Sequence, residues 1–264
     1  MRKPDPDVCR SRYITCYNEK RNEGGERMKY ANIKKAVFRD RPNRFIAHVE
    51  LNGTCAVCHV KNTGRCRELL IPGADVFVQE ADAPNRKTRY DLISVYKGDQ
   101  LINIDAAAPN KIFAEWVWSG GLFQKITLMQ PEYRFGASRL DFYMEADGRR
   151  LFVEVKGVTL EENGVVRFPD APTERGVRHL KELASCVQAG FDAYIVFIIQ
   201  MSGARYFEPN WETHPAFGAA LANAERAGVH IVALDCVVTP NSISAANRIS
   251  VQLLREQKKD GDEK

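Results

Sequence analysis

The 264-residue chain is predicted to be a mixed α/β protein in which a small N-terminal β barrel precedes an α/β domain. Short β-rich runs separated by turn residues fill the region from about 37 to 105. Beyond this region the pattern becomes strand, helix, strand, helix, strand, which is the order of parallel crossovers. The hydrophobic content of 44% allows a substantial core at this length. We therefore expect a barrel over residues 28–108 and an α/β domain with a central mixed sheet over residues 109–254.

The composition favours a cytoplasmic protein without a membrane partner. No apolar run approaches the roughly 20 residues that cross a bilayer, and the charged N-terminus does not resemble a signal peptide. Seven cysteines, an odd number, argue against a secreted disulfide framework. The net charge of +4 is compatible with a nucleic-acid partner but does not require one.

The two ends of the chain are expected to lie outside the folded domains. Residues 1–27 are polar and lack hydrophobic periodicity, so we predict a disordered extension. Gly24 and Gly25 precede a second methionine, Met28, and we expect natural translation to start there. Residues 255–264 alternate in charge and are predicted to form a frayed tail.

The barrel is predicted from five short runs of strand-forming residues. The turn pairs Asn52-Gly53 and Pro72-Gly73, with Gly98 further on, separate consecutive runs. No long helix interrupts this region, which favours a barrel over an open α/β sheet. The predicted strands span residues 45–51, 55–60, 76–78, 92–96 and 101–104.

The second domain is predicted from three helices and the β runs between them. A helix over residues 111–117 ends at Gly120-Gly121, and a helix over residues 174–189 has Thr173 as its N-cap and Gly190 behind it. The apolar run 193–199 suits a strand that is buried on both faces. The remaining predicted elements are a helix over residues 215–227 and a strand over residues 230–234.

Asp147-Gly148 predicts a two-residue hairpin turn between two β runs of this domain. With this turn, Asp141 stands opposite Glu154 and Arg139 opposite Lys156, and all four side chains share one face of the sheet. A second, wholly apolar face supports the register, because a slip by one residue would place charges in the core. The apolar set is Leu140, Phe142, Met144, Leu151, Val153 and Val155.

The opposed carboxylates of Asp141 and Glu154 indicate a divalent-cation site. Two carboxylates about 5 Å apart repel each other unless positive charge lies between them. Hard oxygen ligands with open water positions favour Mg²⁺ or Mn²⁺, and Lys156 can orient a water molecule or stabilise phosphate charge. Hydrolysis of a phosphodiester suits this set. The alternative is an exposed sheet face on which the charged residues form ordinary cross-strand ion pairs.

Two segments of the hairpin resemble the catalytic core of PD-(D/E)xK nucleases: SRLDF at 138–142 and VEVKGV at 153–158. Leu140 replaces the usual proline before the aspartate, at a position that varies widely. More narrowly, nearly everything after Met28 resembles the sugar fermentation stimulation protein family (SfsA). The supporting motifs are HVKNTGR at 59–65, FPDAPTERG at 168–176 with His179, and AGV at 227–229.

The resemblance implies an OB-like barrel, a restriction-endonuclease-like α/β domain and binding to DNA, which we expect to be independent of sequence. It leaves two functions open. In the first, the protein is a Mg²⁺- or Mn²⁺-dependent nuclease with Asp141, Glu154 and Lys156 as its catalytic residues. In the second, it is a non-catalytic DNA-binding regulator of sugar metabolism genes that retains a nuclease-like scaffold.

Further residues are candidates for the same site, each with an ordinary surface role as the alternative. Glu115 on the first helix is a candidate third metal ligand. Asp170 suits either a metal contact or a turn cap. Phe45 or Tyr90 offers a surface on which a base can stack. The candidates for nucleic-acid binding are Lys61, Asn62, Arg65 and Arg67 in the barrel and Arg139, Arg175 and His179 in the second domain.

The cysteine motif at residues 55–59 (CAVCH) matches the spacing of covalent haem attachment, but haem is disfavoured because no export signal is visible. A zinc site from Cys55, Cys58, His59 and Cys66 is also disfavoured. Adjacent strand residues such as Cys58 and His59 point to opposite faces. Cys186 and Cys236 are predicted to be small buried residues, and no catalytic cysteine is expected.

Overall fold

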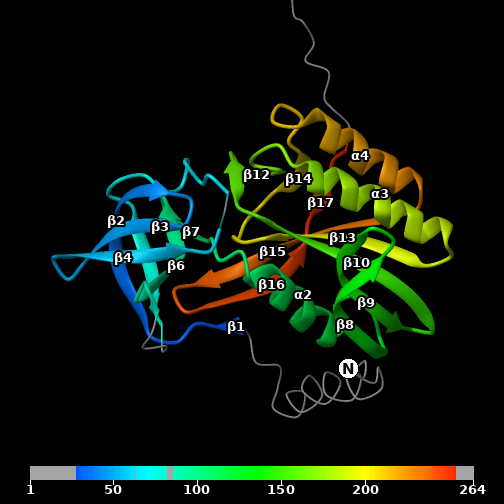
Figure 1. Cartoon of the computed structure of the whole chain (residues 1–264), viewed down its shortest axis with the longest axis horizontal. Helices are drawn as coiled ribbons and strands as arrows, with labels where there is room; N and C mark the ends of the chain where they lie inside the picture. Colours follow the sequence, from blue (N-terminus) through cyan, green and yellow to red (C-terminus); the bar gives the residue numbers. More distant parts are fainter. Residues whose placement is uncertain (1–27, 63, 82–85, 254–264) are drawn as a thin grey trace, which may run out of the picture.

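The computed structural model describes residues 28–62, 64–81 and 86–253. The predictions for residues 1–27 and 255–264 lie outside the described residues. Figure 1 shows a β barrel, in blue and cyan, beside a larger α/β unit in green to red. The predicted fold class is confirmed: a closed five-stranded OB barrel precedes an α/β unit with a mixed sheet.

The barrel is built from five consecutive strands in the order β4-β3-β2-β5-β6. A parallel pairing of β4 with β6 closes it, so neither outer strand is left as an open edge. A further strand, β7 (Gln100–Asn103), forms a hairpin with β6. The barrel strands are β2 (Ile33–Asn43), β3 (Ile46–Leu51), β4 (Thr54–Val60), β5 (Asp75–Glu80) and β6 (Tyr90–Lys97).

The α/β unit contains a seven-stranded mixed sheet in the order β1-β16-β15-β13-β10-β9-β8. The three central strands β10, β13 and β15 are parallel, and the other pairings are antiparallel. The strands are β1 (Met28–Lys29), β8 (Ile126–Phe135), β9 (Ser138–Ala146), β10 (Arg149–Val158), β13 (Asp192–Ile199), β15 (His230–Thr239) and β16 (Ser242–Arg248).

Within the part of the chain that the structure describes, three helices cover the two faces of this sheet (Figure 1). Helix α2 (Ala108–Trp118) packs on one face, and α3 (Glu174–Gln188) and α4 (Pro215–Arg226) pack on the other. All three helices were predicted. The Thr173 cap is also confirmed, because its side chain accepts a hydrogen bond of 3.0 Å from the Gly176 N–H.

Strand β13 is buried on both faces, as its apolar run predicts. Residues Ala193, Ile195, Phe197 and Ile199 belong to the core under α3 and α4, whereas Tyr194, Val196 and Ile198 belong to the core under α2. The strand therefore forms the centre of the sheet, and its neighbour β10 lies between two packed layers.

A small four-stranded sheet, in the order β11-β12-β14-β17, was not predicted. Its strands are two to four residues long, which is too short for a hydrophobic period to be visible. They are β11 (Leu160–Glu162), β12 (Val165–Phe168), β14 (Tyr206–Pro209) and β17 (Ser250–Val251). No helix within the described residues is long and apolar enough to span a membrane.

The barrel joins the α/β unit through buried hydrogen bonds at the end of β7. The Asn103 N–H donates to the Gln200 carbonyl at 2.9 Å, and Gln200 Nε2 donates to Asn103 Oδ1 at 2.9 Å. Asn103 Nδ2 also donates to the Tyr30 hydroxyl at 3.0 Å. These hydrogen bonds therefore hold the barrel beside the carboxyl end of β13.

Candidate active site

The hairpin between β9 and β10 carries four of the predicted site residues, Arg139, Asp141, Glu154 and Lys156. Its register is confirmed over five pairs, from Phe142 with Val153 to Ala146 with Arg149. The turn residues Asp147 and Gly148 have φ values of 49° and 76°. Both values are positive, as a type I′ turn requires, and this turn matches the twist of the flanking strands. The residue types at the turn thus account for the register of the hairpin.

The ladder ends before the predicted pairs of Asp141 with Glu154 and Arg139 with Lys156, which corrects that part of the register. The first half of β9 remains paired with β8, where Arg139 lies opposite Arg134. Asp141 Oδ2 accepts a hydrogen bond of 2.8 Å from the Val155 N–H. The carboxylate therefore takes the place of the backbone acceptor where β9 and β10 separate.

The predicted apolar face is formed by five of its six members. Phe142, Met144, Leu151, Val153 and Val155 lie in one core cluster with Ile112 and Phe113 of α2. Leu140 instead belongs to the core on the α3 side, as does Phe152. Because Leu140 lies in the segment of β9 that has left β10, the alternation expected from a regular hairpin does not extend to it.

Glu154 lies in the interior of the protein, with an exposed fraction of only 2%. Its Oε1 accepts hydrogen bonds from Lys156 Nζ and His179 Nδ1, whereas its Oε2 is buried without a partner among the described residues. Burial raises the pKa of Glu154, but His179 and Lys156 outweigh burial and hold the pKa below its usual range. Glu154 is therefore ionised at neutral pH with one oxygen left to bind a cation.

Asp141 is the second carboxylate of the site and is coupled to Glu154. Its Oδ1 accepts a hydrogen bond of 3.1 Å from Asn110 Nδ2, at the start of α2. Burial, followed by the negative charge of Glu154, raises the pKa of Asp141 above its usual range. A cation between the two carboxylates would relieve this repulsion.

His179 and Arg175 extend the site along α3. His179 is 3% exposed, and Arg175 Nε donates to its Nε2 at 3.3 Å. Because Nδ1 faces the ionised Glu154, this ring nitrogen carries a proton and donates it to Glu154 Oε1. The predicted contact of His179 with phosphate remains a prediction. In the structure, the hydrogen bond between His179 Nδ1 and Glu154 Oε1 orients the Glu154 carboxylate.

Glu115, the predicted third metal ligand, is directed elsewhere on α2. Its Oε2 accepts a hydrogen bond of 3.0 Å from the Met28 N–H of β1. Asn110, more than a turn earlier on the helix, is the α2 residue that reaches Asp141. Across the described residues, no three His, Cys, Asp or Glu side chains gather as a group that could hold a metal ion. The candidate centre thus has two carboxylates.

The donor set fits a small hard cation. The unpartnered Oε2 of Glu154 is a buried, charged acceptor, and such a group is costly unless a cation or donor reaches it. Mg²⁺ is commonly held by one or two carboxylates, with water and substrate oxygens completing an octahedron. Two carboxylates are therefore sufficient for such an ion, whereas a site made only of protein side chains would need more.

The predicted nucleic-acid contacts of the barrel fall into two groups. Lys61 Nζ lies 3.3 Å from Asp91 and 3.4 Å from Asp105, both of which are buried. Its positive charge is therefore largely neutralised by carboxylates of the protein itself. The Asn62 side chain accepts a hydrogen bond of 2.8 Å from the Gly64 N–H and shapes the loop. Arg65 and Arg67, in contrast, are exposed and line a pocket.

The remaining predicted contacts differ in exposure. Phe45 is 51% exposed and offers a stacking face, whereas Tyr90 is buried at 8%. Arg139 is exposed and lies 3.2 Å from Glu132 of β8. The Asp170 carboxylate lies where any Cβ at Gly64 would be, so it packs against the barrel loop. Phe45, Arg139 and Asp170 are therefore the exposed members of this set, and Tyr90 is the buried one.

The five described cysteines are free thiols. Burial raises the pKa of Cys58, Cys66 and Cys186 to about 12, so these thiols stay protonated and unreactive at neutral pH. Cys58 is fully buried, whereas Cys55 is exposed. The two cysteines of the CAVCH motif therefore do not point into one shared environment.

Four residues that lie at the candidate centre or at the pocket of the barrel were not predicted from the sequence. Asn110 and Gln200 flank the candidate centre, and Arg41 and Arg44 line the pocket of the barrel. A signal existed for Gln200, because it follows the buried run of β13, and the carboxyl ends of parallel strands commonly form sites. The other three contacts depend on how separate elements pack, which no local pattern encodes.

The closed barrel and the mixed sheet define a two-domain protein with an OB domain and a restriction-endonuclease-like α/β domain. Family models agree with this division. Residues 40–104 match the model described as the SfsA N-terminal OB domain, and residues 107–242 match the sugar fermentation stimulation protein RE domain. The chain belongs to the sugar fermentation stimulation protein family.

Individual relatives support the family over most of the chain. A sugar fermentation stimulation protein homolog of Desulfitobacterium hafniense (strain Y51) is 60% identical over 227 residues, which cover 86% of this chain and 99% of the relative. The homolog of Clostridium beijerinckii is 55% identical over 226 residues, covering 86% and 100%. The solved structure of Pyrococcus furiosus SfsA in complex with Ca²⁺ has a TM-score of 0.79 at 29% identity and covers 86% of this chain and 99% of that chain.

Proposed function

We propose that this protein is a DNA-binding nuclease that cleaves phosphodiester bonds with the help of Mg²⁺ or Mn²⁺. The observation that carries the proposal is the buried, ionised Glu154, whose Oε2 lacks a partner among the described residues. Burial, followed by the charge of Glu154, raises the pKa of Asp141. Two coupled, buried carboxylates, one with an unused oxygen, are costly unless positive charge compensates them. Cation binding supplies that charge.

The residues of the centre take distinct roles in this proposal. Asp141 and Glu154 hold the cation, which when bound supplies Lewis acidity to the phosphate and to a coordinated water. Lys156 presents its ammonium next to Glu154 and stabilises negative charge on the attacked phosphate. His179 fixes the orientation of Glu154, and Asn110 fixes that of Asp141. Glu115 remains a candidate further ligand only if α2 rearranges.

The choice of cation rests on the chemistry of the ligands. Carboxylate oxygens suit Mg²⁺, Mn²⁺ and Ca²⁺, which are all hard ions. The related Pyrococcus furiosus protein has been solved in complex with Ca²⁺, which supports a divalent site in the family. We propose Mg²⁺ or Mn²⁺ for turnover. Ions of this kind prefer octahedral coordination and are commonly held by only one or two protein carboxylates, with water and substrate oxygens as the other ligands.

DNA is the proposed partner, and contacts to its backbone make binding independent of sequence. Arg65 and Arg67 of the barrel, with Arg139 and Arg175 of the α/β unit, are exposed cations suited to phosphate. Lys61, Asn62 and His179 support these surfaces from within. Since phosphates carry no base identity, such contacts do not select a sequence. The cytoplasmic location expected from the sequence stays a prediction.

A cleavage assay tests the proposal. Purified protein is incubated with single- and double-stranded DNA in Mg²⁺ or Mn²⁺, and the variants Asp141→Asn and Glu154→Gln are compared with Glu132→Gln, which alters an exposed carboxylate on β8. We expect both site variants to lose at least about 100-fold in rate, because even the partners behind metal ligands are worth about 10- to 100-fold. Glu132→Gln should retain activity.

Two outcomes would contradict the proposal. Cleavage that survives both site variants would come from a contaminant. DNA binding without cleavage in any divalent metal, together with no metal bound in titration, would instead favour the non-catalytic regulator of sugar metabolism genes.

A further inference from the structure

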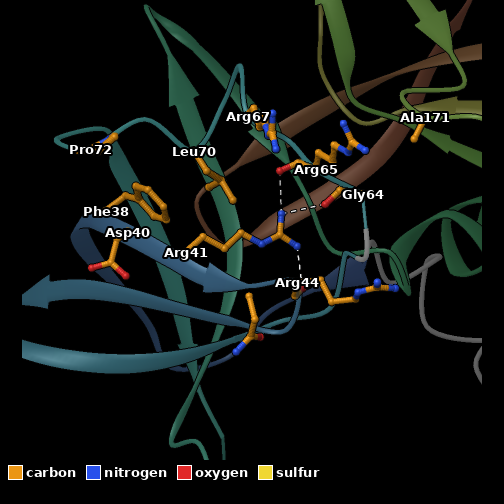
Figure 2. A pocket seen from close by; sticks show the side chains of 11 residues that line it. Phe38, Asp40, Arg41, Arg44, Gly64, Arg65, Arg67, Leu70, Pro72 and Ala171 are labelled. Atoms are coloured by element: carbon orange, nitrogen blue, oxygen red, sulfur yellow. Dashed lines mark hydrogen bonds between the residues drawn. The ribbon is translucent and has the colours of Figure 1, made fainter. Parts of the chain in front are cut away.

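A pocket of about 600 Å³ lies where the barrel faces the loop before α3. Figure 2 shows Arg41 at its centre, with Arg65 and Arg67 on one side and Arg44 on another. Ala171 contributes the α/β unit's part of the wall. The pocket is thus formed by both units and lies apart from Glu154 and Asp141.

The pocket is strongly basic. Its lining contains four arginines and one acidic residue, Asp40. Asp40 Oδ1 is already engaged by His48 Nδ1 at 2.8 Å. In the described part of the chain, no carboxylate forms an ion pair with Arg44, Arg65 or Arg67. These three exposed guanidinium groups are therefore available to an anion.

Arg41 makes the pocket rigid. Its Nη1 donates to the carbonyls of Gly64 and Arg65 at 2.8 and 2.9 Å, and its Nη2 donates to that of Arg44 at 2.7 Å (Figure 2). Nη2 also donates to the Asn62 carbonyl at 2.7 Å. One side chain thereby ties the β2–β3 turn to the loop after β4. The walls that carry the other arginines are held in place before any ligand arrives, which lowers the entropic cost of binding.

A stacking surface adjoins the cationic wall. Phe45 follows Arg44 in the β2–β3 turn and is 51% exposed. The Arg44 guanidinium lies 5.9 Å from the centre of the Phe45 ring. Exposed aromatic rings beside cations form the platforms on which unpaired bases stack, each worth about 1–3 kcal/mol when removed. The site therefore combines groups suited to phosphate with one suited to a base.

We propose that this pocket binds phosphate groups of single-stranded DNA and makes a single strand the preferred substrate, an inference that rests on the proposed function. The pocket volume is in the range that encloses a small ligand. A nucleotide can enter such a concavity, and offer its base to Phe45, only when it is neither paired nor stacked in a duplex. A stiff duplex can meet the pocket only with the phosphates along its edge, and it offers no unpaired base to Phe45.

The position of Ala171 connects the pocket to the candidate active site. Ala171 precedes Arg175 by four residues, a span of at most about 14 Å. Arg175 contacts His179, which contacts Glu154. A strand held in the pocket can therefore continue along the start of α3 to the carboxylates. This path is compatible with the roughly 4–16 nucleotides that one OB fold covers.

The test measures binding rather than cleavage, so that it is independent of the catalytic step. Fluorescence anisotropy in EDTA follows a labelled oligothymidylate longer than the ~16-nucleotide upper limit of an OB-fold site, and a duplex of equal length, across a salt series. The variant is Arg65→Ala with Arg67→Ala, whose side chains are exposed. We expect single-strand affinity to fall about 10-fold or more and the salt slope to decrease by about 1.4, since each lost phosphate contact contributes about 0.7. Duplex affinity should fall by a smaller factor than single-strand affinity.

The control removes the same charge elsewhere: Lys125→Ala with Arg226→Ala, two exposed residues of the α/β unit outside the pocket. Arg44→Ala, from the other wall, should reproduce the selective loss. Equal losses in the pocket and control variants, or equal losses for single strand and duplex, would overturn the inference while leaving the nuclease proposal intact. If the wild-type protein binds neither DNA, the proposed function fails as well.

Discussion

At the residue scale, Glu154 combines deep burial with negative charge, which is costly unless partners compensate it. His179 and Lys156 compensate one oxygen, and this explains why the pKa stays low in spite of burial. The other oxygen has no partner among the described residues. A structural ion pair would be expected to satisfy both oxygens, so the arrangement favours a binding role over a purely structural one.

His179 is expected to act as a positioning residue for the metal site. His179→Ala removes the hydrogen bond to Glu154 Oε1, and we expect Mg²⁺ or Mn²⁺ affinity to fall about 10- to 100-fold, with cleavage largely restored at saturating metal. His179→Asn, whose amide can replace the Nδ1 donor, should recover part of the loss. The metal dependence of the cleavage rate measures both.

The matched control for His179 is Arg178→Ala, an exposed neighbour on α3. It should leave the metal dependence unchanged. If His179→Ala lowers the cleavage rate without changing the metal concentration at half-maximal rate, His179 does not act through the metal ligands.

The candidate carboxylates could be found from the sequence, whereas their partners could not. Asp141, Glu154 and Lys156 follow from strand alternation around a recognisable turn, which is local information. Asn110 and His179 come from two helices on opposite faces of the sheet. Their contacts depend on the rotation and position of each helix, which a single sequence does not specify.

At the scale of elements, the β9–β10 hairpin shows how far from a turn the turn residues determine strand pairing. The Asp147-Gly148 turn sets the register next to it, and five pairs obey that register. Further from the turn, the start of β9 is paired with β8 alone, and the Asp141 side chain accepts a hydrogen bond from the Val155 N–H. The turn thus predicts the five pairs next to it, but not how far the ladder extends.

Gly157, directly after Lys156, is required by close packing. A Cβ there would lie 2.6 Å from Gln200 Oε1 and 2.8 Å from Pro109 Cγ, so Gly157→Ala pushes β10 away from both neighbours. We expect a destabilisation of about 1–3 kcal/mol, as for other overpacked sites, together with a loss of cleavage. Thermal unfolding and the cleavage assay measure the two effects.

Gly148→Ala is the comparison for Gly157→Ala. No atom lies within 4 Å of a Cβ at position 148, and only its φ of +76° opposes the change. It should cost about 1 kcal/mol and leave cleavage intact. Equal effects of the two substitutions on cleavage would contradict the packing explanation.

Strands β2 and β8 escaped prediction because much of their surface is exposed. Only Ala36 and Phe38 of β2 are buried, among five charged residues. Strand β8 is the edge of its sheet and contains Pro131, which is tolerated at edges but argues against a strand in the sequence. Hydrophobic alternation therefore reveals the buried central strands of the α/β sheet and does not reveal strands whose surface is largely exposed.

At the scale of the whole molecule, the barrel and the α/β unit share a buried polar junction. Asn103 bonds both Tyr30 and Gln200, and an ion pair of 2.6 Å joins Lys97 to Glu161. We expect the two units to unfold in one cooperative transition. Asn103→Ala should cost about 1–3 kcal/mol, because it leaves buried partners unsatisfied.

Chemical denaturation measures this coupling, with Gln100→Ala as the control. Gln100 also crosses the junction, donating to the Ser202 carbonyl at 2.6 Å, but its bond is exposed. It should cost less than about 0.5 kcal/mol, as surface changes generally do. Two separate transitions in the wild-type protein would show that the units are energetically independent.

The two-unit architecture could be predicted from the sequence because the change in pattern near residue 108 is large. The junction could not, since Asn103, Gln200 and Tyr30 are far apart in the chain and each has an unremarkable local context. The basic pocket could not be predicted from the sequence for the same reason. Its arginines come from two separate segments of the barrel, and Ala171 comes from the other unit.

Calorimetric titration with Mg²⁺ or Mn²⁺ tests the central claim most directly. Because the pKa of Asp141 is raised, its proton must leave when the cation binds, so affinity should increase with pH until Asp141 is ionised, and binding should release a proton below that pH. Glu154, whose pKa is lowered, is already ionised and contributes no proton. We predict one site that is lost in both Asp141→Asn and Glu154→Gln. Absence of binding by the wild-type protein, or equal binding by both variants, would contradict the account.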